Sequence, residues 1–333
     1  AGGSGGDGVR GGDGDDVILA GFAGEDDRSG QHPADDGNDH YAGGAGFDTY
    51  DASFAVAAMR IDLDEGKAAG ADIGTDTLEG IEAVIGGSGN DTIVGDSGAN
   101  RLDGGAGDDV LVALSGNDIV VGGAGNDMFA IALAAAVIES LGESDGDDSY
   151  DGGEGCDTYD ASAARKAVVI DLEEGRACGE EIGNDILTSI EAAIGGAGAD
   201  TIYAGLGVNF LAGGAGADVF VFRSLDTIRN RGEGRDEIRD FGVGDRIDLS
   251  KIAEGLGGLI FDDSDGRESS HEINRIRLYH EGFDDQERTV IRAVIDFEHD
   301  EDIEILLHGR HELTAQDFIL AARDALDRDD PST

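Results

Sequence analysis

A nine-residue unit recurs through the first two thirds of the chain and constrains its fold more than any other feature. The unit reads G-G-x-G-x-D-x-U-x, where U is a large apolar residue, and residues 86–130 contain five units without a gap. The sixth positions of this run are Asp91, Asn100, Asp109, Asp118 and Asp127. The eighth positions are Ile93, Leu102, Leu111, Val120 and Phe129. Such a short period is typical of a solenoid, in which each unit packs on its neighbours.

A second, longer period lies on top of the first. Further units lie at 2–10, 11–19, 34–42, 43–51, 143–151, 152–160 and 195–221, and a degenerate unit from Ala20 has Glu25 at the acidic position. Residues 43–109 align without a gap on residues 152–218, with about 40 identical positions. The chain therefore contains a duplicated solenoid.

The composition of the unit predicts how it folds. Glycine reaches positive φ without steric cost, so G-G-x-G-x-D suits a turn, whereas x-U-x suits a short strand with one inward side chain. Two units then make one coil of about 18 residues, with a strand on each side of a thin core. Stacked coils would pair their strands in parallel and align their acidic side chains in two columns.

These columns predict a metal. Like charges one coil apart repel each other, and carbonyl and carboxylate oxygens between the turns form an all-oxygen site. Such a site suits Ca²⁺, which takes 6–8 oxygen ligands, better than Mg²⁺ with its strict octahedral geometry. The alternatives are solvated acidic turns without a metal, or nonspecific screening by salt.

Charge and composition exclude several classes of function. The chain has 23 Lys+Arg against 73 Asp+Glu, a formal charge of −50, which disfavours nucleic acid and anionic membranes as partners. No apolar stretch approaches the roughly 18 residues of a membrane span. The start lacks signal-peptide features and an initiator Met and lies inside a repeat, so we expect a fragment or a processed product. Cys156 and Cys178 fit neither a disulfide framework nor a zinc cluster, which leaves two thiols or one incidental bridge.

The repeats resemble those of the RTX (repeats-in-toxin) family over most of residues 1–221. The resemblance implies a right-handed parallel β-roll, or β-helix, that binds several Ca²⁺ ions. Each ion would take the carbonyls of positions 2 and 4 and the Asp of one turn. The next coil would add the carbonyls of positions 1 and 3 and its Asp.

The implied ligand sets follow from that scheme. They are Gly87, Gly89 and Asp91 with Gly104, Ala106 and Asp109; Gly105, Gly107 and Asp109 with Gly122, Ala124 and Asp127; and Gly196, Gly198 and Asp200 with Gly213, Ala215 and Asp218. Near the start, Gly12, Gly14 and Asp16 would face Ala34, Asp36 and Asp39 if residues 26–33 bulge outward. We also expect Asp48, Asp118, Asp148 and Asp157 to bind calcium. The substitutions Asn100 and Asn209 predict weaker binding, notably in the column of Asn100 and Asp118, and Glu25 puts its own site in doubt.

The segments between the repeat runs are duplicated as well. Residues 54–85 and 163–194 each contain an alternating apolar run, a Glu-Gly turn and a second apolar set. We expect them to be wider coils that continue the solenoid, with a structural role only.

The last third has a different composition and the pattern of an antiparallel β cap. Asp236–Phe241 and Gly244–Ser250 resemble the segment that follows the calcium repeats in serralysin-type proteases and other type I secreted proteins. Alternating runs at Ile273–Tyr279, Thr289–Phe297 and Asp302–Leu307 predict antiparallel strands. Thr314 with Asp317 predicts a capped helix leading into residues 318–320. The resemblance implies that this region also carries an export signal, for which Leu313–Leu320 is the candidate.

No catalytic constellation is present in the sequence. His311-Glu312 is followed by Ala315 where a zinc-protease motif needs His, and no G-x-S-x-G motif occurs. His308 and His311 are either metal ligands or, as we favour, solvated loop residues between a strand and a helix. We therefore expect a chain that is not an enzyme.

We divide the chain into a first β-roll block at 1–130, a second at 131–221 and a capping and secretion region at 222–333. The predicted function is folding on Ca²⁺ after type I secretion to the extracellular space, with calcium and the secretion machinery as partners. The alternatives are a calcium-dependent structural or adhesive surface protein that self-associates, and the accessory domain of a secreted protease, lipase or epimerase.

Overall fold

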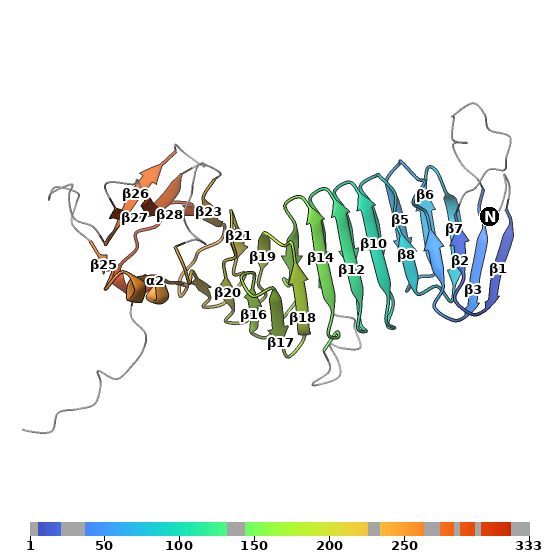
Figure 1. Cartoon of the computed structure of the whole chain (residues 1–333), viewed down its shortest axis with the longest axis horizontal. Coiled ribbons are helices and arrows are strands. Elements are labelled where there is room, and N and C mark those ends of the chain that lie inside the picture. Colours follow the sequence, from blue (N-terminus) through green and yellow to red (C-terminus); the bar gives the residue numbers. More distant parts are fainter. Residues whose placement is uncertain are drawn as a thin grey trace, which may run out of the picture. The chain divides into compact units, whose positions relative to one another are not determined.

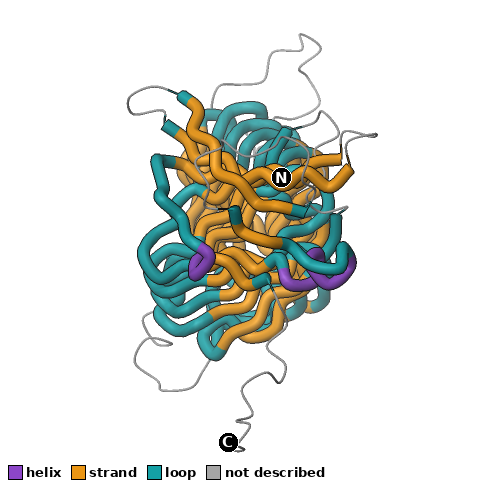
Figure 2. The backbone as a smooth tube through the Cα atoms, turned by 90° about the vertical axis from the view of Figure 1, so that its left-hand side faces the viewer, coloured by secondary structure: helices purple, strands orange, loops and turns teal. Residues whose placement is uncertain are grey.

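The computed structural model is built almost entirely of β-strands. It describes residues 6–20, 37–131, 144–225, 234–262, 274–282, 287–296 and 301–320. Within these ranges the helical elements are one short helix, α2 (Ser250–Gly255), and one 3-10 turn, η2 (Ala315–Asp317). Figure 2 shows how strongly strands and loops dominate the backbone.

The chain divides into two compact units. Unit 1 comprises Ala1–Ile170 and Gly175–Ala197, and unit 2 comprises Asp171–Glu174 and Gly198–Thr333. We describe each unit by itself.

Unit 1 consists of two facing sheets. The first sheet has the order β1 (Gly8–Asp13), β3 (His40–Ala45), β7 (Gly74–Glu79), β6 (Lys67–Gly70), β5 (Met59–Asp62), β9 (Thr92–Val94), β11 (Val110–Val112), β13 (Met128–Ala130), β15 (Thr158–Asp160) and β19 (Ala192–Ile194). The second has the order β2 (Val17–Leu19), β4 (Thr49–Asp51), β8 (Ala83–Ile85), β10 (Arg101–Ala106), β12 (Ile119–Ala124), β14 (Ser149–Glu154), β18 (Gly183–Thr188), β17 (Arg176–Gly179) and β16 (Val168–Asp171). Figure 1 shows β10, β12 and β14 side by side.

The strand register confirms two units per coil. Leu102 pairs with Val120 and Leu111 with Phe129, so parallel partners lie 18 residues apart. The eighth-position side chains form the core, and Leu102, Leu111, Val120 and Phe129 are all fully buried. Each contributes about 1.5–3 kcal/mol of hydrophobic stabilisation. The core is therefore a thin layer of apolar side chains, with one row contributed by each sheet.

The two segments between the repeat runs differ from the expected wide coils. In the first copy, β5, β6 and β7 run antiparallel to one another, while β7 pairs in parallel with β3 and β5 with β9. The reversal follows from the Glu-Gly turn, because Gly66 has φ +63° and Gly74 has φ +71°. The second copy repeats this turn at Gly175 and Gly183, with β17 and β18 antiparallel. Each segment is thus a meander spliced into a sheet.

Unit 2 begins with parallel strands and ends in an antiparallel sheet. One sheet has the order β20 (Thr201–Tyr203), β22 (Val219–Val221), β24 (Arg246–Asp248) and β29 (Phe318–Ile319). The other has the order β21 (Phe210–Ala212), β23 (Asp236–Ile238), β28 (Glu301–His308), β27 (Arg288–Asp296), β26 (Arg275–Glu281) and β25 (Ile260–Phe261). Strands β26, β27 and β28 pair antiparallel, which confirms the three strands predicted for the cap.

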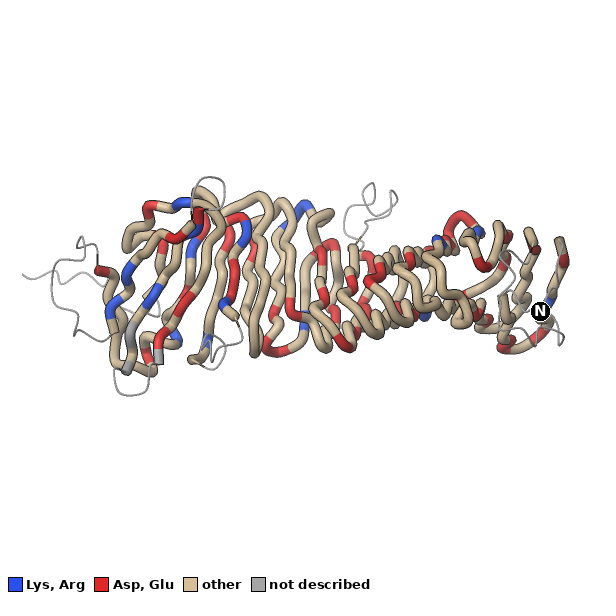
Figure 3. The backbone as a smooth tube through the Cα atoms, turned by 90° about the horizontal axis from the view of Figure 1, so that it is seen from above, with Lys and Arg blue, Asp and Glu red and all other residues tan. Residues whose placement is uncertain are grey.

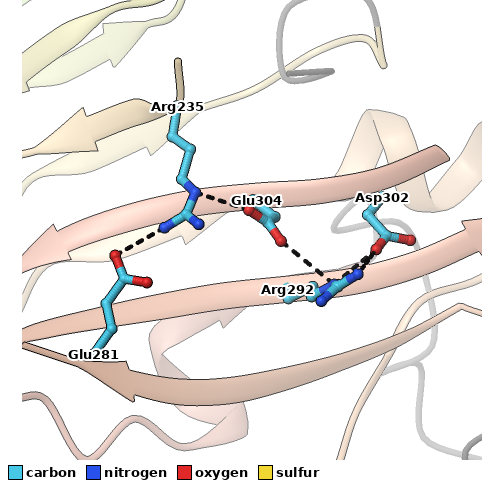
Figure 4. A network of polar contacts seen from close by, with 5 residues as sticks. All are labelled: Arg235, Glu281, Arg292, Asp302 and Glu304. Atoms are coloured by element: carbon cyan, nitrogen blue, oxygen red, sulfur yellow. Dashed lines mark hydrogen bonds and ion pairs between the residues drawn. The ribbon is translucent and has the colours of Figure 1, made fainter. Parts of the chain in front are cut away.

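An ion-pair network crosses this antiparallel sheet (Figure 4). Arg235 contacts Glu281 at 2.9 Å and Glu304 at 2.8 Å, and Glu304 also lies 3.4 Å from Nε of Arg292. Arg292 in turn donates from Nε to Asp302 at 2.7 Å. Acidic side chains in this part of the chain are thus neutralised by the chain's own arginines.

The helix predicted after Thr314 is wrong in its extent. Thr314 does cap a turn, since its hydroxyl accepts from the Gln316 amide at 3.2 Å and Asp317 accepts from the Thr314 amide at 2.6 Å. The turn stops after one 3-10 step, because Phe318 is buried and pairs with Ile247 in the β24–β29 ladder. Strand pairing here overrides the local helix signal.

Candidate metal centre

The sixth-position carboxylates form two ladders of hydrogen bonds. Along each ladder, the Oδ1 atom of an Asp accepts the backbone N–H of the sixth residue one coil earlier; the ladder of Asp91 begins differently, with Oδ1 of Asp91 accepting the Met59 amide at 2.8 Å. In one ladder Asp91 donates to Asp109 at 2.7 Å, Asp109 to Asp127 at 2.9 Å and Asp127 to Asp157 at 2.7 Å. In the other, Asn100 donates to Asp118 at 2.7 Å and Asp118 to Asp148 at 2.8 Å. The ladders fix one oxygen of each carboxylate without a metal.

The second oxygen of these carboxylates is buried without a hydrogen-bond partner among the residues that the structure describes. This holds for the Oδ2 atoms of Asp16, Asp48, Asp109, Asp118, Asp127, Asp157, Asp218 and Asp236. An ionised oxygen left in this state is strongly destabilising, so it needs a cation or a proton. Asp91 is different, because its Oδ2 accepts the Gly87 amide at 2.9 Å.

Burial also raises the pKa of these carboxyl groups. Desolvation raises the pKa of Asp109 and of Asp118 to about 7, and neighbouring carboxylates on each ladder add to the shift. The same causes raise the pKa of Asp157 and Asp218 to about 6, and burial raises the pKa of Asp236 to about 7. The folded chain therefore resists carrying these charges without a counter-ion.

Backbone carbonyls gather beside the same carboxylates. Gly105 and Gly107 have φ +100° and +113°, and a Cβ on them would lie 2.3 Å from the Gly87 carbonyl oxygen and 2.5 Å from that of Gly89. A Cβ on Gly104 would meet Asp109 Oδ2 at 2.3 Å and the Gly122 carbonyl oxygen at 2.8 Å. The stacked turns leave room only for glycine and collect oxygen atoms between them.

The donor set fits calcium. No group of three His, Cys, Asp or Glu side chains that could hold a metal occurs in the described part of the chain, so a site must use backbone carbonyls. Two of the implied carbonyls already accept hydrogen bonds, Gly87 from the Ala106 amide at 2.9 Å and Ala124 from the Gly107 amide at 2.7 Å. A carbonyl oxygen has a second lone pair, and a site made only of oxygens suits a hard cation.

The structure brings the first two implied ligand sets onto adjacent coils. Gly105 pairs with Gly123 and Ala106 with Ala124, and Asp91, Asp109 and Asp127 follow one another on a ladder. In unit 2, Asp200 donates to Asp218 at 2.8 Å, while a Cβ on Gly216 would lie 1.8 Å from the Gly198 carbonyl oxygen. Gly196, from the same set, lies in unit 1 beside Ala164.

The first coil has a different partner from the one expected. Gly12 pairs with Gly44, and the Asp16 amide donates to Asp48 at 2.8 Å, so Gly12, Gly14 and Asp16 face the turn at 43–48. Asp39 instead accepts from the Asp7 amide at 2.7 Å. The intervening excursion makes this register 32 residues instead of 18, which moves the partner turn by one unit. Ala34, Asp36 and Glu25 lie outside the described residues.

Six acidic residues outside the predicted sites extend the ladders. Their carboxylates accept sixth-position amides at 2.8–3.1 Å, and they are Asp76, Glu82, Asp185, Glu191, Asp236 and Asp245. Each stands two residues before a core position, as in Asp76-Thr77-Leu78 and Asp236-Glu237-Ile238, but none follows a complete G-G-x-G turn. The shorter pattern, an acidic residue followed by x-U, would have found them.

Near the meanders, buried tyrosines donate hydrogen bonds to the ladder carboxylates. Tyr41 donates to Asp39 Oδ2 at 3.0 Å and Tyr150 to Asp148 Oδ2 at 3.0 Å, with both rings buried. Tyr50 and Tyr159 donate in the same way to Asp76 and Asp185. These carboxylates have a tyrosine donor for their second oxygen, whereas Oδ2 of Asp109, Asp118 and Asp127 has no donor among the described residues.

The remaining candidate residues make ordinary protein contacts. His308 Nε2 lies 2.9 Å from Glu237 Oε2 at the end of β28, and His311 Nε2 lies 2.7 Å from the His308 carbonyl oxygen. Both cysteines are reduced thiols. In the described ranges we find no helix with the length and apolarity to span a membrane. Figure 3 shows acidic residues recurring along the repeats, while Lys and Arg are frequent on the later strands.

Comparison with known proteins agrees with this geometry. Residues 148–320 match the family profile described as peptidase M10 serralysin C terminal. Residues 34–50, 76–111, 85–120 and 94–129 match the profile of the RTX calcium-binding nonapeptide repeat. No curated protein sequence gave a significant match.

Among solved structures, the chain is similar to the AlgE6R3 subunit of the mannuronan C5-epimerase from Azotobacter vinelandii. The match has 20% identity, covers 73% of this chain and 92% of that chain, and has a TM-score of 0.24, which is too low to support a conclusion. The serralysin profile alone spans just over half of the sequence. The chain therefore belongs to the serralysin C-terminal family, and its first part is a parallel β-roll of RTX repeats that bind calcium.

Proposed function

We propose that this chain is a calcium-triggered folding module of a protein exported by type I secretion. The buried, unpartnered Oδ2 atoms of the ladder carboxylates carry the proposal. Each coil that folds buries a carboxylate whose charge only a cation or a proton can offset. Calcium that binds the folded state and not the unfolded chain therefore stabilises folding by its own binding free energy.

The proposed ligand sets follow the observed register. They are the carbonyls and carboxylates of residues 87–91 with 104–109, of 105–109 with 122–127, and of 198–200 with 213–218 within unit 2, and at the start Gly12, Gly14 and Asp16 with Gly43, Ala45 and Asp48. Asp118, Asp148 and Asp157 continue the two ladders.

Secretion supplies the trigger. In the cytosol, where calcium is scarce, a charge of −50 keeps the repeats extended. Extracellular calcium modules have dissociation constants of roughly 10⁻⁴–10⁻³ M, so folding waits until the chain is outside the cell. The match to the C-terminal profile of a secreted-peptidase family supports export for this chain.

Far-ultraviolet circular dichroism with a calcium titration tests the proposal. We expect a chain with little β-structure in chelator that gains it cooperatively as calcium is added. Magnesium at the same concentration is the control and should have a much smaller effect. A chain that is already β-rich in chelator would overturn the trigger.

A second function is compatible with the first, namely an accessory region of a secreted peptidase. The description of the profile that matches residues 148–320 favours it. This chain itself should then show no casein hydrolysis in calcium or zinc. Proteolysis that a chelator abolishes would contradict that expectation.

A further inference from the structure

The fifth position of the repeat carries a second ladder that runs opposite to the first. The side-chain oxygen at position 5 accepts the N–H of the corresponding residue one coil later. Asp108 donates to Asn90 at 3.1 Å, Asn126 to Asp108 at 2.8 Å and Cys156 to Asn126 at 2.9 Å. The direction is reversed from the sixth-position ladder, in which the acceptor lies one coil later.

Every Asn or Asp at position 5 of a described repeat makes this bond. Besides Asn90, Asp108 and Asn126, the acceptors are Asp15 to the Phe47 amide, Asn38 to the Thr75 amide, Asn117 to the Asp147 amide and Asp147 to the Asn184 amide, at 2.8–3.3 Å. All seven acceptor side chains are exposed, so packing in the core does not explain why they are Asn or Asp. What they share is the hydrogen bond that each accepts from the next coil.

Where position 5 is Asn or Asp, the two ladders together join a pair of stacked turns by hydrogen bonds in both directions, an arrangement that we call the clamp. Between residues 86–91 and 104–109, the Asp91 amide donates to Asp109, while the Asp108 amide donates back to Asn90. The Asp109 carboxylate and the backbone amide of Asp108 are thereby both tied to the earlier coil. Oδ1 of Asp109 is used by the clamp, and Oδ2 is left in the oxygen-lined space between the turns.

The duplication provides a natural comparison. The last three repeats have Ala199, Val208 and Ala217 at position 5, and none of these side chains can accept a hydrogen bond. Asp200 still donates to Asp218 at 2.8 Å, so half of the clamp remains. Asn90 in the first copy corresponds to Ala199 in the second, and both positions are exposed.

We propose that the position-5 Asn and Asp side chains are positioning residues that hold the ladder carboxylates in calcium-binding geometry. The inference rests on the proposed function, because it concerns the same calcium sites. It predicts that the clamped repeats release calcium more slowly than the last three.

Calcium release into a fluorescent chelator, followed by stopped flow on the full chain, tests the proposal. Asn90→Leu keeps the size of the side chain and removes the acceptor, so we expect one phase to become about two- to tenfold faster, the worth of one hydrogen bond. Asn90→Asp restores the acceptor and should restore the slow phase. Ala199→Asn should slow release from the last repeats, and Ala199→Leu is its control.

The outcomes separate the two proposals. A wild-type chain that releases calcium but is already folded in chelator contradicts calcium-triggered folding. In that case the release rates of the variants still decide whether the position-5 side chains hold the calcium sites. Unchanged release rates in Asn90→Leu and Ala199→Asn overturn the clamp, even if the thermal midpoint of either variant moves. A wild-type chain without any calcium release overturns both.

Discussion

The repeats and the C-terminal region are both acidic, yet they deal with their charge in opposite ways. Residues 1–221 hold 44 acidic and 8 basic side chains, whereas residues 222–333 hold 29 and 15. In the C-terminal region, carboxylates such as Glu304 and Asp302 lie within 3.4 Å of arginine nitrogens (Figure 4). In the repeats, ladder carboxylates such as Asp109 contact backbone amides and leave one oxygen buried and unpartnered.

This difference separates what each region needs in order to fold. The arginine partners belong to the chain itself, so these ion pairs can form whether or not calcium is present. The ladder carboxylates need a cation or a proton from outside the chain. Under the proposed function, one region folds only with calcium and the other folds without it, although both are built from similar strands.

The largest effect should come from removing calcium. Hydrogen–deuterium exchange on the full chain in chelator should show the turns of residues 86–130 exchanging orders of magnitude faster than in calcium. Strands β26–β28 should lose much less protection, because their carboxylates keep their arginine partners. An equal loss of protection in both regions would remove the distinction.

A glycine substitution should show that only the repeats stack their turns in contact. Gly123 has φ +112° and a Cβ there would lie 2.0 Å from the Gly105 carbonyl oxygen, so Gly123→Ala should cost about 1–3 kcal/mol from the backbone and a similar amount from crowding. Gly244 has φ +107°, but its nearest neighbour is the Ala217 Cβ at 3.3 Å, so Gly244→Ala should pay only the backbone cost. Thermal midpoints in calcium compare the two variants, and similar losses would argue against close stacking.

Removing one ladder charge should have opposite effects with and without the metal. Asp109→Asn should weaken the calcium transition by on the order of tenfold, because a charged ligand is lost. In chelator, where the wild type should have little β-structure, circular dichroism of the same variant should show more, because a buried, unpartnered charge is gone. Asn100 already shows that Asn fits a sixth position, where its Oδ1 accepts the Asp96 amide at 2.7 Å. Asp7→Asn, at the exposed first coil, is the matched control and should change both measurements less.

The pH dependence should also reverse with calcium. The folded-state pKa values of Asp109 and Asp118 are raised to about 7 from an ordinary value near 4, so the metal-free fold binds protons more tightly than the unfolded chain. Its stability should therefore fall as pH rises between about 4 and 7. In saturating calcium the trend should flatten or reverse, since the metal displaces those protons. Circular dichroism in chelator should therefore show β-structure decreasing as pH rises, and β-structure that increases with pH would contradict the assignment.

The smallest effect should come from the arginine network. Arg235→Gln removes contacts to Glu281 and Glu304, which are partly exposed, and should cost about 0.5–1 kcal/mol. The loss should be the same in calcium concentrations above the folding transition and should shrink in high salt. Arg310→Gln, whose partner Glu312 is largely exposed, is the control and should be near neutral. A calcium-dependent loss would mean that the two regions share their counter-ions.

Much of the fold could be predicted because the nine-residue period is visible in the sequence. Spacing alone led to the 18-residue register of Leu102 with Val120 and to the buried eighth positions. It did not predict the partner of Gly12, because the register there depends on how many residues leave the coil, and local sequence does not encode that number. The strand at Phe318 was missed for a related reason, since its partner Ile247 lies far away in sequence.

The ladders were only partly predictable. Asp91 and Asp109 stand out because a complete G-G-x-G turn precedes each of them, whereas Glu82 and Asp236 accept the same kind of bond after an incomplete glycine pattern. The role of position 5 was not expected at all, since the repeat pattern leaves it unspecified. Hydrogen bonds between coils become visible only once the coils are stacked.

The positions of the two meanders show how the duplication changed the roll. The copies lie 109 residues apart, which is not a whole number of 18-residue coils, and the first meander lies in the sheet of β1 whereas the second lies in the sheet of β2. The same sequence thus folded on opposite faces after the duplication. Both sheets of the roll are built from the same nine-residue unit. The roll can therefore gain or lose half a coil and keep its fold, so evolution can insert a single unit as well as a pair.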